Sequence, residues 1–477
     1  MKRILHAACA AAAFACGSTN PTPLEGSASV DALFSVPANG VSCIRLVASG
    51  TMRSVQSDFP VAPGQNTVGL EMHAIPTGTV MFSGNAYTES CGNIVASSVP
   101  SWMADDVTVN VTPGSPVSVQ LNFHANGNAT VQGNFIPDVF TVTTLAGKVG
   151  QPGSADLTGP SAQFGGPQAV AFDGNNTLYV ADRFGPSGSF TGMSIRALNV
   201  TTGAVTTLAG NPTAVGTGDG AGSAARFSLL QGIAFAANTL YIADACAIRA
   251  MTTTQPFTVS TLLGTRAASQ AWDCSSGPGS IFDIAVHGTD LYVTDPARFL
   301  VLKISGTPPI VTTVAGTPGV SGSTDGAPAS AQFLGPQAIV FTDATDNFTV
   351  ADRGTLDGAS FFGLLRRVSN SAVTTLAGSE QMGSMIDGLR TNAFFALPRR
   401  MVSDGTSVFV TDQNAIRRFD ILTGAVVTIA GSIAAGSADG VGAAAGFTAV
   451  SGLARNANTK ALYLADTGNF TIRVLAP

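Results

Sequence analysis

A six-residue phrase recurs six times after residue 140 of this chain. The first copy reads VTTLAG at 142–147, and every copy ends in glycine. Successive closing glycines lie 52 to 63 residues apart. A period of this length among short β-rich runs predicts a repeat architecture, in which each unit buries its apolar face against its neighbours. The six copies occupy 142–147, 205–210, 259–264, 311–316, 373–378 and 426–431.

Each repeat contains four strand-like segments. The phrase leads through a loop rich in Gly, Ser and Ala to an apolar run such as 169–172. A second run ends in aspartate, as in LYVAD at 178–182, and an Ile-Arg pair such as Ile195-Arg196 follows. Four strands per unit match one blade of a β-propeller. The sequence therefore predicts an all-β fold with one blade per repeat.

The repeat frame also predicts how the ring closes. The phrase is the outermost strand of the blade that precedes it, so the last blade, at about 450–475, has no copy of its own. We expect 142–147 to supply that outer strand, which removes two exposed sheet edges and gives six blades.

The order of Phe, Ile/Val-Ala, LYVAD, Ile-Arg and VTTLAG resembles the NHL-repeat family of β-propellers, in its bacterial exported or lipoprotein form, over residues 142–477. The resemblance implies a six-bladed NHL propeller, whose domain we place at 138–477. Residues 24–137 show no trace of the repeat. Their alternating apolar runs, clearest at 107–111 and 117–123, suggest a small immunoglobulin-like β-sandwich.

The chain begins with the pattern of a targeting segment. Two basic residues precede a short apolar run at 4–15, which is too short to span a bilayer. Cys16 follows directly, ahead of a polar stretch. We expect a signal peptide over 1–15, lipidation at Cys16 and a tether over 16–23, in an outer-membrane lipoprotein of a Gram-negative bacterium. Plain signal cleavage and secretion is the alternative.

The remaining cysteines predict disulfides. Four are left after the leader, an even number that suits an exported chain, and none has metal-ligand spacing. Cys43 and Cys91 can staple the 24–137 domain. We expect Cys246 and Cys274 to form a second bridge, because their loops lie on the same propeller face in adjacent blades.

The residue types argue against several kinds of chemistry. The repeated Asp and Arg occur in nearly every blade, so we interpret them as structural rather than catalytic. The repeats contain one histidine, His287, and one glutamate, Glu380, too few for a His-based zinc site. An axial calcium site made of Asp and Asn is not excluded. We predict no catalytic residues, no metal and no cofactor.

Charge argues against nucleic acid as a partner. The formal net charge is −6, whereas nucleic acid and anionic membrane surfaces attract basic proteins. Three Arg pairs nevertheless fall in blades four and five, at 366–367, 399–400 and 417–418. We interpret them as a solvated surface or as contacts to an acidic partner.

Two blades carry a longer loop between the aspartate and the Ile-Arg pair. These loops, 183–194 in blade one and 353–364 in blade four, face each other in a six-bladed ring. Insertions on one face of a repeat protein often mark its binding face, and neutral drift in tolerant loops is the alternative. Trp272 is either a hydrophobic plug or a ligand-stacking ring. The candidate binding residues are Phe190, Phe361, Phe362, Trp272 and His287.

These features predict a binding or scaffold module rather than an enzyme. It would engage an extracytoplasmic protein, a glycan or a small ligand through one propeller face, as a monomer that contacts membrane only through its N-terminal lipid. The alternative is a propeller enzyme, a lyase or lactone hydrolase that uses a divalent cation bound in the channel.

Overall fold

The computed structural model divides the chain into two compact units, Met1–Ile136 and Pro137–Pro477. No helix in the described part is long and apolar enough to cross a membrane. Short 3-10 turns are η1 (Cys91–Asn93), η2 (Gly159–Ser161), η3 (Gly222–Ala224), η5 (Arg390–Asn392), η6 (Gly442–Ala444) and η7 (Thr467–Asn469). The structure describes residues 26–34, 41–50, 54–61, 67–94, 98, 100–111, 117–125, 140–264, 281–343, 345–355, 361–380 and 385–477.

The described strands of the first unit join into one sheet. They pair in the order β3-β2-β5-β6-β8-β1-β4, with β7 beside β5. The two ends of this order, β3 and β4, lie in contact, so the sheet curls around one apolar core that includes Leu46, Phe82 and Phe123. The strands are β1 (Gly26–Phe34), β2 (Cys43–Ser49), β3 (Ser54–Pro60), β4 (Thr67–Ile75), β5 (Gly78–Tyr87), β6 (Trp102–Ala104), β7 (Val107–Val111) and β8 (Val117–Ala125).

This pairing differs from the expected immunoglobulin-like sandwich. Such a sandwich divides its strands between two sheets. Here the short strand β6 pairs with both β5 and β8, and so connects strands that the sandwich would separate.

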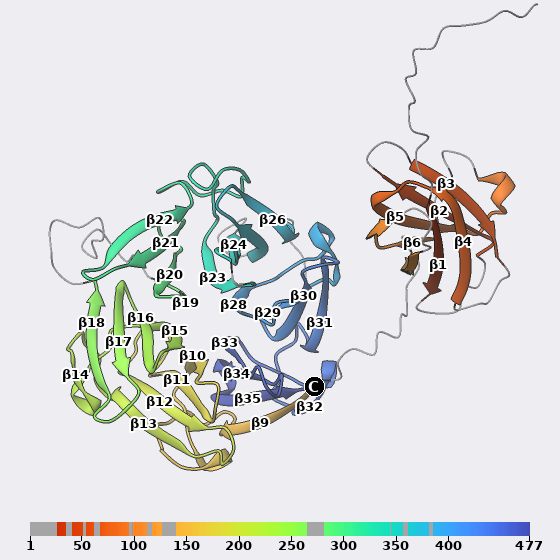
Figure 1. Ribbon diagram of the computed structural model, residues 1–477. Helices are drawn as coiled ribbons and strands as arrows, with labels where there is room; N and C mark the ends of the chain where they lie inside the picture. Colours follow the sequence, from red (N-terminus) through yellow and green to blue (C-terminus); the bar gives the residue numbers. More distant parts are fainter. Residues whose placement is uncertain are drawn as a thin grey trace, which may run out of the picture. The chain divides into compact units, whose positions relative to one another are not determined.

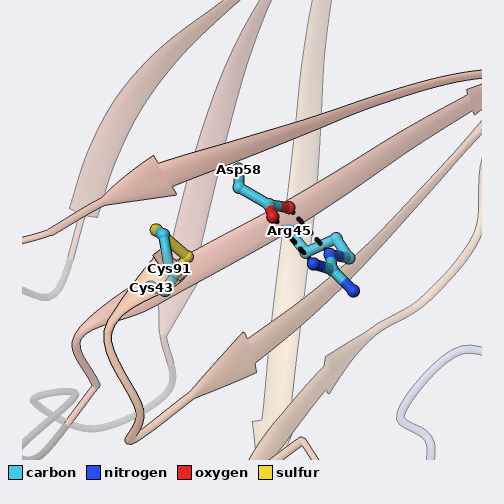
Figure 2. The surroundings of a disulfide bond; sticks show 4 residues. All are labelled: Cys43, Arg45, Asp58 and Cys91. Carbon is cyan, nitrogen blue, oxygen red and sulfur yellow. Dashed lines mark hydrogen bonds and ion pairs between the residues drawn. A yellow bond between two sulfur atoms is a disulfide. The ribbon is translucent and has the colours of Figure 1, made fainter. Parts of the chain in front are cut away.

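A disulfide ties the start of β2 to η1 in the first unit. Cys43 and Cys91 form this bridge, as predicted (Figure 2). Two residues along β2, Arg45 donates two hydrogen bonds of 2.7 Å to the carboxylate of Asp58 on β3. The bridge and the ion pair hold the same corner of the unit.

The second unit is a β-propeller. Within its described residues, six antiparallel sheets of four or five strands surround a common axis (Figure 1). The innermost strands β10, β15, β19, β23, β28 and β33 contact one another in a closed ring.

The main strands of each sheet follow the sequence order from the axis outward, β9 completes the last sheet, and β14, β27 and β32 lie at the outer edges of sheets two, five and six. Sheet one is β10 (Pro167–Phe172), β11 (Thr177–Phe184), β12 (Gly192–Asn199) and β13 (Val205–Asn211); sheet two is β15 (Leu230–Ala236), β16 (Thr239–Asp244), β17 (Ala247–Thr252), β18 (Thr258–Leu263) and β14 (Gly220–Ala221). Sheet three is β19 (Ile284–His287), β20 (Asp290–Asp295), β21 (Leu300–Ser305) and β22 (Ile310–Ala315); sheet four is β23 (Pro336–Phe341), β24 (Phe348–Thr355), β25 (Phe361–Val368) and β26 (Val373–Gly378). Sheet five is β28 (Pro398–Ser403), β29 (Ser407–Asp412), β30 (Ala415–Asp420), β31 (Ala425–Gly431) and β27 (Gly388–Leu389); sheet six is β33 (Val450–Arg455), β34 (Leu462–Asp466), β35 (Thr471–Ala476), β9 (Thr141–Gly147) and β32 (Gly440–Val441).

The first copy of the recurring phrase completes the last sheet. β9 pairs antiparallel with β35, with Val142 opposite Leu475 and Gly147 opposite Thr471. The C-terminus therefore lies beside β9 (Figure 1). This pairing confirms the predicted closure of the ring by an N-terminal outer strand.

Glycine closes every copy of the phrase for a steric reason. All six closing glycines have φ between 79° and 120°, a region that L side chains rarely adopt. A Cβ at Gly378 would lie 2.2 Å from the carbonyl oxygen of Gly363 on the neighbouring strand. The backbone therefore approaches its neighbour at the end of each outer strand more closely than any side chain allows.

The repeated Asp and Arg form a buried network inside the sheets. In sheet one, Asp182 accepts hydrogen bonds from the backbone N–H groups of 165–166 and lies 3.1 Å from Nη1 of Arg196. Nη2 of Arg196 lies 2.6 Å from Asp156, which also accepts from the backbone and hydroxyl of Thr207. One arginine thus ties the inner loops to the outer strand, and its role is structural.

Four other sheets repeat this network. Sheet three departs from it: Lys303 stands at the arginine position and pairs with Asp290 at 2.7 Å. The repeated arginines and their two aspartates are Arg249 with Asp219 and Asp244, Arg366 with Asp325 and Asp352, Arg417 with Asp387 and Asp412, and Arg473 with Asp439 and Asp466.

Candidate functional site

The innermost strands of all six sheets line a cavity on the propeller axis. Its volume is about 210 Å³, and most of the residues that line it are apolar, although the surface exposed inside it is mainly polar. Each innermost strand carries one large apolar residue at the same height along the axis. In every sheet this residue pairs with the third residue of LYVAD or its equivalent, as Val170 pairs with Val180. These residues are Val170, Ile233, Ile284, Ile339, Met401 and Leu453.

At the position directly before this apolar residue, two sheets carry a charged side chain. Four sheets carry Ala or Gly there, whereas sheet three has Asp283 and sheet five has Arg400. Both charged side chains are buried, and Arg400 Nε lies 3.6 Å from Asp283 Oδ1. Asp283 also accepts a hydrogen bond of 3.1 Å from the backbone N–H of Ile339 on sheet four. Burial raises the pKa of Asp283, and the charge of Arg400 opposes that rise.

Arg400 crosses the end of the cavity. Its Nη2 donates to the carbonyl oxygens of Gln231 in sheet two and Phe282 before sheet three, each at 3.0 Å, and its guanidinium lies 4.3 Å from the centre of the Phe282 ring. A side chain from β28 therefore reaches the sheet on the far side of the ring. These contacts hold Arg400 and Asp283 together across one end of the channel.

Three more arginines gather at this end. Arg183 follows the aspartate of sheet one, and Arg353 occupies the same place in sheet four. Arg183 Nε donates to the carbonyl oxygen of Leu230 at 2.5 Å, and its Nη2 donates to Oε1 of Gln231 at 2.6 Å. We call Arg183, Arg353, Arg399 and Arg400 the arginine cluster.

Burial and the positive charges of neighbouring arginines lower the pKa values in the arginine cluster. Burial, followed by the charges of Arg400 and Arg399, lowers the pKa of Arg183 to about 9. Burial, followed by the charges of Arg353 and Arg400, lowers the pKa of Arg399 to about 10. The four guanidinium groups therefore share one positive field, although they come from sheets one, four and five.

Within the described residues, one carboxylate faces this field. Asp283 pairs with Arg400, whereas no carboxylate of the described residues forms an ion pair with Arg183, Arg353 or Arg399. Nε of Arg399 is buried and has no hydrogen-bond partner in the described part of the chain. A buried guanidinium without a counter-charge costs free energy.

The predicted binding residues divide into two groups. Phe190 and Phe361 lie against the cluster: the guanidinium of Arg183 is 5.2 Å from the centre of the Phe190 ring, and that of Arg353 is 5.0 Å from the centre of the Phe361 ring. Phe362 is buried at 3% exposure, and its ring packs against Gly354 on the paired strand. Each long loop therefore brings one phenylalanine to the cluster.

His287 lies away from the cluster. It ends β19 at the opposite end from Asp283, stacks on Phe341 at 4.2 Å between ring centres, and places Nε2 3.5 Å from Asp346. Trp272 and Cys274 lie outside the described residues. Cys246 is disulfide-bonded in the structure.

The three Arg pairs separate by role. Arg366 and Arg417 belong to the buried network, and only the 399–400 pair lies at the channel. Sequence reasoning missed Arg183, Arg353 and Asp283 as site residues. Their signal is a comparison between repeats: the residue after the LYVAD aspartate is arginine in the two long-loop sheets, and Ala, Pro, Gln or Thr in the others.

No group of three or more His, Cys, Asp or Glu side chains that could hold one ion occurs in the part of the chain that the structure describes.

Comparison with known proteins shows the fold. No family model and no curated protein matches this chain. It is similar to a structural-genomics protein of unknown function from Bacteroides thetaiotaomicron (TM-score 0.52, 18% identity, covering 91% of this chain and 90% of that one). It is also similar to an auxiliary nutrient binding protein from the same organism (TM-score 0.51, 14% identity, 91% and 90% covered). A third protein from that organism carries a provisional phosphatase description (TM-score 0.50, 13% identity, 91% and 90% covered). At these identities the likeness extends to the fold, and the chain is similar in architecture to these Bacteroides proteins.

Proposed function

We propose that this chain is an exported, lipid-anchored propeller of NHL type, with six blades, that works as a binding module. Its ligand would bind at the end of the channel that carries the arginine cluster. One observation carries the proposal: the two long loops, on opposite sheets, each bring an arginine–phenylalanine pair to that end. A repeat protein needs no such pairs for its own packing, because the other sheets close with short turns.

Two further findings support an exported binding role. The disulfide between Cys43 and Cys91 suits an oxidising compartment outside the cytoplasm. The auxiliary nutrient binding protein that shares the fold is described as binding a nutrient, which agrees with a binding role for the present chain.

A double variant tests the binding face. Phe190→Ala with Phe361→Ala removes the rings that hold Arg183 and Arg353, and Leu422→Ala, in an 85% exposed position of another turn, is the matched control. Against a panel of sugars, sugar phosphates, organic acids, amino acids and nucleotides, calorimetry should find a ligand that the double variant binds at least about tenfold more weakly. Equal affinity of the double variant and the control would contradict the proposal.

Two simple measurements test the other parts. Cys16→Ala should prevent acylation, detected by mass spectrometry, and should release the protein from the membrane fraction. Elemental analysis of the purified chain tests the enzyme alternative, because tightly held, stoichiometric Ca²⁺ or Zn²⁺ would favour a propeller enzyme over a binding module.

A further inference from the structure

The arginines of the second unit fall into two groups that differ in counter-charge. Each of the five network arginines is at most 1% exposed and contacts two aspartates within 3.2 Å. In the arginine cluster, by contrast, four guanidinium groups face the single carboxylate of Asp283 among the described residues. Among the residues that the structure describes, these four positive charges and one negative charge leave an excess of three. The rest of this fold neutralises its buried arginines, so the cluster is built differently.

Several N–H donors of the arginine cluster form no hydrogen bond with the described part of the chain. No side chain or backbone carbonyl of the described residues accepts a hydrogen bond from Arg353 or Arg399, and Nε of Arg399 is buried. Arg183 uses Nε and Nη2, so its Nη1 remains. In Arg400, by contrast, both Nη groups donate hydrogen bonds to carbonyl oxygens. Arg353 and Arg399 are therefore the groups best able to bind a ligand, and Arg400 is positioned by the fold.

The shape of the cluster suits an oxyanion. A planar guanidinium donates two parallel hydrogen bonds to a carboxylate or phosphate, and such charge-assisted bonds are the stronger ones in proteins. The guanidinium groups of Arg183 and Arg353 lie over the rings of Phe190 and Phe361, a contact that uses none of their N–H groups for hydrogen bonds. The four arginines come from three sheets, so an anion between them would contact opposite sides of the ring.

We propose that the arginine cluster binds the oxyanion group, phosphate or carboxylate, of a small ligand, with Arg353 and Arg399 as its main contacts and Arg183 as a further donor. This inference rests on the proposed binding function of the same propeller face and names the chemistry of its ligand. The excess of three positive charges favours a multiply charged anion over a monovalent one. The ligand supplies the negative charge that aspartates supply elsewhere in the fold.

The test uses the full mature chain and two defined probes. Inorganic phosphate and citrate represent the two sources of the oxyanion, and chloride at matched ionic strength is the reference. Calorimetry and thermal unfolding are measured for the wild type, Arg353→Gln, Arg399→Gln and a control, Arg367→Gln. Arg367 is an exposed arginine on β25, in the same sheet as Arg353.

We expect one probe or both to bind the wild type with one site per chain and to raise its unfolding temperature above that in chloride. Arg353→Gln and Arg399→Gln should each weaken that binding about tenfold or more, because a hydrogen bond to a charged group is lost, and Arg367→Gln should not. Phosphate binding alone indicates a phosphorylated ligand, and citrate binding alone indicates a carboxylate ligand.

A second readout is independent of affinity. Without anion, Arg399→Gln should unfold at a higher temperature than the wild type, because it removes a mostly buried charge that no carboxylate of the described residues pairs with. Absence of phosphate and citrate binding, or equal binding in Arg367→Gln and both cluster variants, would overturn the inference. A different outcome is that the ligand panel of the Phe190→Ala, Phe361→Ala test reveals a neutral ligand, while neither phosphate nor citrate binds. In that case the proposed binding function is supported and the inference of an anionic ligand is wrong.

Discussion

Removing the carboxylate of Asp439 should loosen the closure of the propeller ring. Asp439 accepts hydrogen bonds from the backbone N–H of Thr144 at 3.1 Å and from its hydroxyl at 2.9 Å. It also accepts one from Nη2 of Arg473 at 2.7 Å. Thr144 lies on β9 and Arg473 on β35, so this carboxylate links the two ends of the second unit.

The contacts set the expected loss of stability. In Asp439→Ala three hydrogen bonds to a charged carboxylate disappear, one of them from a guanidinium, which gives roughly 4–9 kcal/mol if each is lost in full. Asp439 is 48% exposed, so water replaces part of these contacts. Arg473 keeps Asp466 at 2.9 Å and is not left unpaired. The net cost should be about 2–3 kcal/mol, or roughly 3–4 °C in unfolding temperature.

Asp156→Ala is the matched control. Asp156 makes the same contacts to Thr207 and Arg196 within sheet one, but its outer strand β13 follows β12 through a short hairpin. Both variants should lose similar stability in thermal unfolding. In hydrogen exchange, however, the amides of β9 should lose protection in Asp439→Ala far more than those of β13 in Asp156→Ala, because β9 has no hairpin to hold it in place.

Equal protection of β9 in the wild type and in Asp439→Ala would refute this reasoning, even if the unfolding temperature falls. So would a loss of protection in β13 as large as that in β9. Either result would mean that backbone pairing with β35, rather than the side-chain link, determines the opening of the ring.

Three further predictions concern other parts of the chain. Gly378→Ala should cost about 3 kcal/mol or more in thermal unfolding, because its Cβ would lie 2.2 Å from a backbone oxygen, whereas Gly174→Ala, with open space around it, should cost about 1 kcal/mol. Partial burial raises the pKa of Asp219, but hydrogen bonds from Thr261 and Arg249 outweigh this effect and hold the pKa below the usual 3.8. The stability that Asp219 contributes should therefore be fully present above about pH 4 and be lost as the pH falls further. In denaturant titrations, Asp219→Asn should reduce this loss of stability at low pH. The Cys43→Ala, Cys91→Ala double variant should lower the stability of the first unit by about 4 kcal/mol, as expected for a bridge between residues 48 apart, and a second calorimetric transition that moves equally would contradict the division into two units.

The sequence by itself determined the architecture of the second unit. The phrase at 142–147 is an outer strand in every copy, and its closing glycine is required by a positive φ and a close backbone approach. These are local demands that recur in each repeat, so the period could be read directly. The closure by β9 followed from counting strands in that frame. The first unit, which has no repeat, offered no such frame, and its pairing through β6 was not foreseen.

Only the tertiary structure decided the site. Arg183 and Arg400 lie 217 positions apart, and both hold Gln231, yet no pattern along the chain relates them. The loops suggested Phe190 and Phe361 as ligand contacts, whereas the structure places their rings against arginines. The formal net charge of −6 describes the whole chain. The electric field at a site depends on which charges the fold brings within a few ångströms of one another, and here closing the ring gathers four arginines around one aspartate.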